Sequence, residues 1–403
     1  MNFTLNRSHI GMVLCSFLLT VYGLNLDHFN GEFIGMPPYK LWLIMFFACF
    51  PLLLAVSGLR ALVTSPLFLW LLLYNVISLY SLSYSPNAEI AYDGFVMLLS
   101  TNLIMLPAIL ASYYAYRLPV WLLIILFSLA CGSVVFDYLL PFVTMGWTSK
   151  GLVDRAAGLY LNPNSAASLI PLMMTLTLLK SPNALRFALI GLASLAILLT
   201  FSRSGMFLFV FTIVALNICG ILPRRYFGYL MVTIGAVFIT GTASVAIKAL
   251  LNIQSTNALD RFDLFFGSND VDTLVDDPRI LLFYSALQNY WEHPFIGQGL
   301  GFSFYWENNN SFGQGSHNMF LRLMLDFGIV GALLWIAFCI ALYIQSAKQG
   351  NKNFAIYVTG YALFASIFSH NLPEASWFLT LIILLAGITT TMQSHNEKLK
   401  SSK

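Results

Sequence analysis

The chain has 403 residues, of which 58% are hydrophobic and only 9% are charged, and its formal net charge is +3. A soluble domain carries about 25% charged residues, so this composition excludes a soluble globular protein. Most of the chain must be solvated by lipid. We therefore expect an all-α, polytopic membrane protein whose partners include membrane lipids and no nucleic acid.

Twelve apolar segments approach the length of about 20 residues that a bilayer-crossing helix needs. They cover approximately residues 9–25, 39–58, 66–83, 94–115, 119–137, 164–180, 184–202, 205–221, 226–249, 319–345, 354–371 and 375–393. The five cysteines all fall inside these segments, which is typical of cysteines used in packing rather than in disulfides or zinc sites. The sequence thus predicts about 12 transmembrane helices in a single domain over residues 1–403, without a cleavable signal peptide.

The basic residues predict the orientation of these helices. With the N-terminus inside, 12 of the 20 Lys and Arg residues fall on the cytoplasmic side, together with a single acidic residue, Glu397. Every predicted inner segment then contains Lys or Arg, as the positive-inside rule requires. We therefore expect both termini in the cytoplasm and, in a bacterium, the other face of the inner membrane in the periplasm.

Two connections on the predicted outer side are long, at about 138–163 and 250–316. Connections of more than about 15 residues are usually functional or disordered. Residues 279–292 place apolar side chains at helical spacing, which predicts a surface helix within the second connection. His293-Pro294 would end this helix before a glycine-rich turn. We expect function to concentrate in this large periplasmic loop.

Four arginines on the outer side are candidates for anion binding: Arg155, Arg203, Arg261 and Arg279. Arg203 lies in Ser-Arg-Ser-Gly between two spans joined by almost no loop, so its charge lies at or below the membrane surface. A charge there is costly, which favours a functional role. The planar guanidinium can bind two phosphate oxygens at once. The alternative is a side chain that extends to the interface or forms a structural salt bridge.

The segment Arg155-Ala-Ala-Gly-Leu-Tyr-Leu-Asn-Pro-Asn leads into the sixth predicted span. Asn162 or Asn164 can cap this helix, and Pro163 suits its first turn. Capping explains one asparagine but not Arg155. A helix N-terminus beside an arginine is also a suitable anion site.

His317-Asn318 stands where the long outer loop re-enters an apolar run, nine residues before Gly328-Ile-Val-Gly331. An imidazole at a membrane surface is well placed to act as a general base. The structural alternative is a hydrogen-bonded histidine at a helix start. The glycine pair allows a close approach of helices beneath the site.

The acidic residues of the outer loop give a weaker signal. Asp270 and Asp272, with Asp276 and Asp277, have a spacing that could hold a divalent metal. Solvated acids are common in loops, so we expect no metal site and no cofactor.

Together these motifs resemble the O-antigen ligase family, which also includes O-antigen polymerases and protein O-oligosaccharyltransferases. The similar pieces are the Arg155–Asn164 segment, Ser202–Gly205, Arg279 ahead of His293–Gly299, and His317-Asn318 before the glycine pair. They span about residues 150–335. The spacing after His-Asn is the one that ligases show.

The resemblance implies an inverting glycosyltransferase that needs neither metal nor nucleotide. Its donor would be a glycan on undecaprenyl diphosphate, and its acceptor would be lipid A–core on the periplasmic side. By resemblance, His317 would be the base, and Arg203 and Arg279 would hold the diphosphate. The substrate-binding residues would be Arg155, Asn162, Asn164, Arg261 and Asn318. A polysaccharide polymerase, which extends lipid-linked repeat units, and a flippase for lipid-linked sugars are the alternatives.

Overall fold

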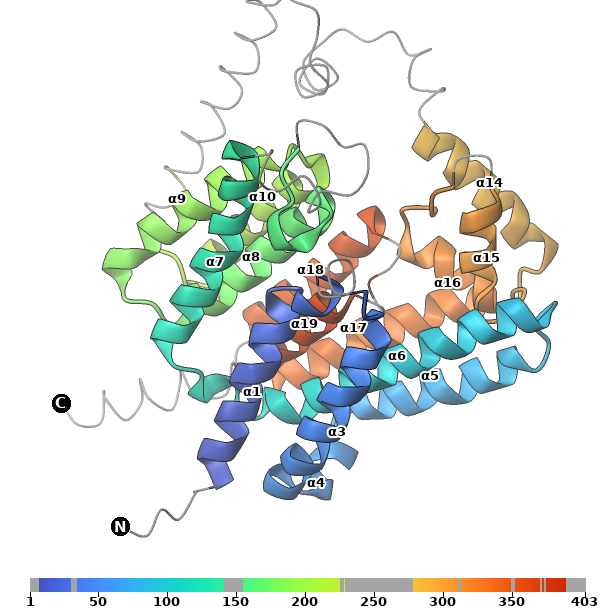
Figure 1. Ribbon diagram of the computed structural model, residues 1–403, viewed down its shortest axis with the longest axis horizontal. Coiled ribbons are helices and arrows are strands. Elements are labelled where there is room, and N and C mark those ends of the chain that lie inside the picture. Colours follow the sequence, from blue (N-terminus) through green and yellow to red (C-terminus); the bar gives the residue numbers. More distant parts are fainter. Residues whose placement is uncertain are drawn as a thin grey trace, which may run out of the picture. The chain divides into compact units, whose positions relative to one another are not determined.

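In the computed structural model (Figure 1), the described residues are 7–29, 35–140, 155–224, 228, 278–310, 313–348, 352–369, 372 and 375–388. All regular secondary structure in these ranges is helical, which confirms the all-α prediction. The chain divides into two units. One consists of Met1–Pro119 together with Asp277–Lys403, and the other consists of Val120–Asp276. We call them unit 1 and unit 2.

Unit 1 has its core around its last helix, α19, whose side chains are all buried. α19 packs against α1, α6 and α17, and α5 lies beside α6 (Figure 1). The helices of unit 1 are α1 (Arg7–Gly23), α3 (Pro38–Ser57), α4 (Leu59–Val63), α5 (Pro66–Leu82), α6 (Ala88–Ser112), the short η1 (Ala115–Arg117), α14 (Pro278–Glu292), α15 (Phe302–Asn309), α16 (Met319–Phe327), α17 (Ile329–Ala347), α18 (Lys352–Phe368) and α19 (Ser376–Ile388).

Unit 2 is built around α8, most of which is buried. α8 packs against α7, α9 and α10. The helices of unit 2 are α7 (Val120–Leu139), the short η2 (Gly158–Tyr160), α8 (Pro163–Lys180), α9 (Asn183–Leu199) and α10 (Arg203–Ile218).

Four of the described helices are long and apolar enough to cross a bilayer: α3, α6, α7 and α17. Four shorter apolar helices accompany them: α5, α9, α10 and α19. By length and composition the chain is a multi-pass membrane protein. The span predicted at 226–249 lies outside the described residues apart from Gly228. The number of twelve spans and their orientation stay predictions.

The span predicted at 319–345 is in fact two helices, α16 and α17, which meet at Gly328. Gly328 has φ +62°, and a Cβ there would lie 2.4 Å from the backbone of Phe295. The chain therefore turns where hydropathy alone indicates a continuous helix. Only α17 has the length of a span. The helix predicted at 279–292 is confirmed as α14, and its place at the membrane surface stays a prediction.

Candidate active site

In unit 2, Arg155 joins the first turn of α8 to the turn before α10. Its side chain is 8% exposed. Nε donates to the carbonyl oxygen of Thr200 at 2.9 Å, and Nη2 donates to Asn164 Oδ1 at 2.9 Å. Ser202 Oγ donates to the same Asn164 oxygen at 2.9 Å. We call Arg155, Asn164, Thr200 and Ser202 the Arg155 network; it fixes the two turns of unit 2 to each other.

The two predicted capping asparagines have different contacts. Asn162 is the N-cap of α8, and its Oδ1 accepts from the backbone N–H of Asn164 at 2.8 Å. Asn164 lies inside the first turn of α8 and uses its side chain to reach Arg155 and Ser202. The structure thus gives the cap to one asparagine and the arginine contact to the other.

Arg203 is the first residue of α10 and is half-buried. Ser202 is the N-cap, and its Oγ accepts from Gly205 N at 3.3 Å. An ideal Cβ on Gly205 would lie 2.1 Å from Ala167 Cβ, so α10 lies tightly on α8 at this point. The guanidinium therefore starts from a fixed backbone, at a helix end where N–H groups favour an anion.

Asp137 is a part of this region that the sequence analysis missed. Its buried carboxylate, near the end of α7, accepts from the N–H groups of Ala157 and Gly158 at 2.7 and 3.0 Å. These bonds hold the residues that follow Arg155. The signal in the sequence was a single acidic residue in the otherwise apolar run Val120–Leu139, where a charge is costly unless it has partners.

In unit 1, His317 directly precedes the N-cap of α16. Asn318 is that cap, and its Oδ1 accepts from Leu321 N at 3.1 Å. His317 is half-buried and has φ +51°. The structure therefore places the imidazole beside a capped helix start, on backbone in the left-handed region.

The four non-glycine residues with positive φ in the described ranges are Asn25, Leu161, Phe201 and His317. Leu161 precedes Asn162, and Phe201 precedes the Ser202-Arg203 pair. Such backbone costs about 1–3 kcal/mol and tends to occur at functional sites. Three of the four therefore coincide with motifs singled out from the sequence.

The end of α16 is held against residues 293–301 by backbone contacts, and we call this the glycine junction. Gln298 N and Gly299 N donate to the carbonyls of Leu325 and Asp326 at 2.9 and 3.0 Å. Ile329 N donates to Pro294 O at 2.8 Å. Tightly packed glycines line both sides, because Cβ atoms on Gly297 or Gly328 would lie 2.4 Å from backbone atoms.

Two side chains support the junction. Asp326, which is fully buried, accepts from Ser303 N at 2.8 Å and Ser303 Oγ at 3.0 Å, and so ties α15 to α16. Tyr84 donates from its hydroxyl to Ile296 O at 2.7 Å. Burial raises the pKa of Tyr84, and the neighbouring Tyr80 raises it to a smaller extent. This hydroxyl therefore keeps its proton.

The structure describes less of the remaining predicted site residues. Arg279 is the second residue of α14, and the structure describes its backbone alone. Arg261 lies outside the described residues, as do the acids at 270, 272, 276 and 277. Within the described ranges, no group of three or more His, Cys, Asp or Glu side chains is placed to hold a metal ion.

Residues 188–336 match the family model for O-antigen ligase, which confirms the resemblance over that range. The match includes Arg203, Arg279 and His317 and begins after Arg155, Asn162 and Asn164. A comparison with curated proteins gives no match. Over residues 188–336 the chain is therefore similar to proteins of the O-antigen ligase family.

Proposed function

We propose that the protein is an O-antigen ligase that moves a glycan from undecaprenyl diphosphate to lipid A–core at the periplasmic face of the inner membrane. An acceptor hydroxyl oxygen bonds to the anomeric carbon as the bond from that carbon to the diphosphate oxygen breaks. The hydroxyl proton passes to His317, and the diphosphate stays on its carrier. A single displacement of this kind inverts the anomeric configuration, whereas retention needs a second one.

The observation that carries the proposal is the position of Arg203 within the family match, at the capped N-terminus of α10. Charge grows on the leaving diphosphate as the glycosidic bond breaks. A fixed guanidinium and a helix N-terminus stabilise that charge more strongly in the transition state than in the ground state. We propose that Arg279 shares this role and that Arg261 binds substrate.

Arg155 takes a supporting role in this scheme. Its two described hydrogen bonds go to Thr200 O and Asn164 Oδ1, and these acceptors lie in the turns that precede Arg203 and begin α8. Arg155 and Asn164 would therefore position Arg203 and keep its helix end aimed at the substrate. Asn162 would fix the neighbouring helix start.

His317 would be the general base. Asn318 caps α16 and fixes the backbone that follows the imidazole. A base held on a rigid helix start needs little reorganisation when the acceptor hydroxyl arrives. We propose no metal ion in this step, since the proton goes to the imidazole and the charge of the leaving group to arginine.

The test is the set of lipid-linked intermediates in a strain that lacks the protein. A ligase predicts accumulation of full-length glycan on the carrier and unmodified lipid A–core. A polymerase would instead leave single repeat units capping the core, and a flippase would leave lipid-linked repeats facing the cytoplasm. Either of these two results would overturn the ligase proposal. Complementation with the wild type, Arg203→Ala and, as control, the exposed Arg60→Ala links the phenotype to the site.

The orientation is part of the proposal and has its own test. By the positive-inside rule, we propose that both termini lie in the cytoplasm, on the side with the excess of Lys and Arg. Reporter fusions at the C-terminus and between Lys348 and Lys352 should be active only as cytoplasmic reporters. A periplasmic signal from either fusion would reverse the face on which Arg203 and His317 act.

A further inference from the structure

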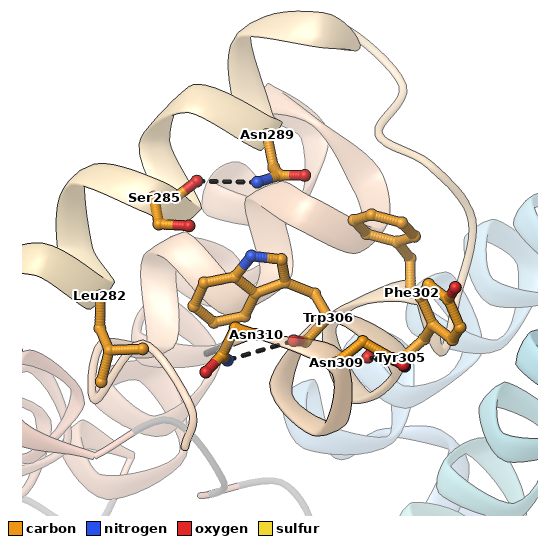
Figure 2. Close-up of a pocket in the computed structure, with 8 residues that line it drawn as sticks. All are labelled: Leu282, Ser285, Asn289, Phe302, Tyr305, Trp306, Asn309 and Asn310. Atoms are coloured by element: carbon orange, nitrogen blue, oxygen red, sulfur yellow. Dashed lines mark hydrogen bonds between the residues drawn. The ribbon is translucent and has the colours of Figure 1, made fainter. Parts of the chain in front are cut away.

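A cavity of about 240 Å³ lies between α14 and α15 in unit 1 (Figure 2). Pockets that enclose a drug-sized ligand usually have about 300–1,000 Å³. The cavity is therefore suited to a single small ring rather than to a whole oligosaccharide. It is separate from the residues assigned above to the reaction.

The base of the cavity is apolar and mostly aromatic, and it is buried. Leu282, Phe302 and Trp306 line it, and all three belong to a buried cluster that includes Leu321 and Leu325 of α16. Trp306 is only 7% exposed. The negative face of an aromatic ring attracts the slightly positive C–H groups on one face of a sugar ring. A rigid indole can hold such a ring without first losing side-chain freedom.

The rim of the cavity carries hydroxyl and amide groups, and none of the lining side chains is charged. Asn289 Nδ2 donates to Ser285 O at 2.9 Å, and Asn309 Nδ2 donates to Tyr305 O at 2.8 Å. These bonds orient both amides and leave their Oδ1 atoms as acceptors. Amides and hydroxyls both donate and accept, so the rim matches a neutral ligand with several hydroxyl groups.

Two polar groups of the aromatic residues add to this pattern. Figure 2 shows the indole nitrogen of Trp306 on the side of Ser285 and Asn289. Within the described part of the chain, neither this N–H nor the Tyr305 hydroxyl has a hydrogen-bond partner. By contrast, Trp291 on α14 is 65% exposed and lies outside the cavity. Trp306 therefore lines a cavity in which a ligand can bind, whereas Trp291 is only exposed.

The cavity is coupled to the chain that carries His317. Asn310 lies on the rim, and its Nδ2 donates to Gln314 O at 2.7 Å, three residues before His317. Ser303 at the start of α15 is bound to Asp326 of α16, the helix that begins after His317-Asn318. A ligand in the cavity is therefore held by the same packed elements as the imidazole.

We infer that this cavity is a subsite for one neutral sugar ring of a glycan substrate. The identity of the glycan rests on the proposed function, whereas the binding chemistry rests on the aromatic base and the uncharged polar rim. Two sources supply such a ring: the core oligosaccharide of the acceptor and the glycan of the donor. The subsite would hold a sugar apart from the bond being made and so raise the local concentration of the reacting hydroxyl or anomeric carbon.

The test uses the purified full-length protein in detergent and two soluble probes. One is core oligosaccharide released by mild acid from lipopolysaccharide, and the other is the O-antigen oligosaccharide freed from its carrier. Saturation-transfer NMR and a titration measure binding. We expect one probe to bind, and Tyr305→Ala and Asn309→Ala each to raise its Kd about fivefold, the effect of losing one hydrogen bond.

Matched controls lie beside both positions. Tyr284 is 60% exposed on α14 and Asn308 precedes Asn309, and neither lines the cavity. Tyr284→Ala and Asn308→Ala should leave Kd unchanged. The inference is overturned if neither probe binds, or if the control and cavity variants weaken binding equally. Whichever probe binds identifies the acceptor or the donor as the source.

The failure of this inference can be told from the failure of the proposed function. Arg203→Ala and His317→Gln should keep the wild-type affinity for the free oligosaccharide while transfer is lost. If those variants transferred glycan normally, the proposed reaction would be wrong, yet sugar binding that depends on Tyr305 and Asn309 would still establish the subsite. If transfer failed in them and no oligosaccharide bound, only the subsite would be withdrawn.

Discussion

Two packed regions, the Arg155 network of unit 2 and the glycine junction of unit 1, are held in opposite ways. In unit 2, the Arg155 network is made by side chains: one guanidinium, one amide and one hydroxyl link two turns. In unit 1, the glycine junction is made by backbone N–H and C=O groups that meet because side chains are missing. The first arrangement is weakened by a substitution that removes a polar side-chain atom. The second is weakened by a substitution that adds a Cβ to a glycine.

This difference separates the consequences of mutation. Removing a polar side chain from the Arg155 network should affect the orientation of Arg203 more than the stability of the fold. An added methyl group in the glycine junction should disturb the fold itself, because backbone cannot move aside as a flexible side chain can. Substitutions of Arg203 and His317 test the chemistry, and substitutions in the Arg155 network and the glycine junction test the way each region is held.

The largest expected effect is that of His317→Gln. Loss of a general base typically lowers transfer by ~10²–10⁴-fold, while expression and the thermal midpoint in detergent should not change. A purely structural role predicts something else, because Asn and Gly tolerate positive φ. His317→Asn and His317→Gly would then restore activity. Near-normal transfer by a stable His317→Gln protein would remove His317 from the mechanism.

Arg203→Ala should lower transfer by ~10²-fold, since it removes one charged donor to the leaving group. Arg203→Lys should recover only part, because an ammonium cannot make the paired hydrogen bonds of a guanidinium. In the Arg155 network, Arg155→Ala should lower both transfer and the thermal midpoint. Transfer assays and melting curves on the same preparations separate the two arginines. Full activity in Arg203→Ala would contradict the diphosphate role.

Gly297→Ala tests the glycine junction. Gly297 has φ +71°, and its Cβ would lie 2.4 Å from the backbone of Asp326. Gly313 has φ +57° with nothing within 4 Å, so Gly313→Ala carries only the backbone strain of ~1–2 kcal/mol. Gly297→Ala adds overpacking, which costs ~1–3 kcal/mol more. Its thermal midpoint should therefore fall further; equal midpoints would mean that the junction is loose.

Ser202→Ala should have a smaller effect. It removes the N-cap of α10 and one bond to Asn164, and loss of a cap costs ~1 kcal/mol. Ser202→Gly should cost only a few tenths of a kcal/mol as a cap but loses the same bond to Asn164. If the two variants are equally slow in transfer and differ in thermal midpoint, the network matters for activity and the cap for stability. An activity that follows the midpoint would contradict this division.

The smallest expected effect is that of chelation. The proposed chemistry gives the proton to His317 and the charge to arginine, so transfer should continue in EDTA. The competing interpretation uses Asp270 and Asp272 of the outer loop as metal ligands. Transfer that stops on chelation and returns with Mg²⁺ or Mn²⁺ would establish it. Asp270→Asn with Asp272→Asn should then show the same loss.

Local rules predicted the features that depend on neighbours in sequence. Asn162 caps α8, α14 forms where apolar spacing indicated it, and the predicted turn with Gly297, Gly299 and Gly301 follows α14. Hydropathy missed the break between α16 and α17. A glycine in an apolar run does not indicate that another segment of backbone packs against it. That backbone belongs to residues 294–296, more than thirty positions earlier.

Long-range partners were the other omission. Asp137 was a single acid in an apolar run, and its partners, the N–H groups near residue 157, are far away in the chain. Asp326 follows Arg322 by four residues, and its bond with Ser303 is likewise distant in sequence. The sequence shows that a buried carboxylate needs a partner but not which segment supplies it. Arg155 was singled out as a candidate for anion binding; its contacts with Thr200 and Asn164 became visible only in three dimensions.

The short helix α16 sets a limit on where the proposed reaction can occur. Its nine residues span roughly 13 Å at 1.5 Å per residue, and they separate His317 from the first residues of the apolar α17. In the proposed topology α17 crosses the bilayer, so the imidazole would act within a layer no deeper than the length of α16 above it. A glycan of any length would have to present its reactive end within that layer, so chain length alone would not decide which polymers are accepted. What would decide is how closely the last sugar approaches the lipid.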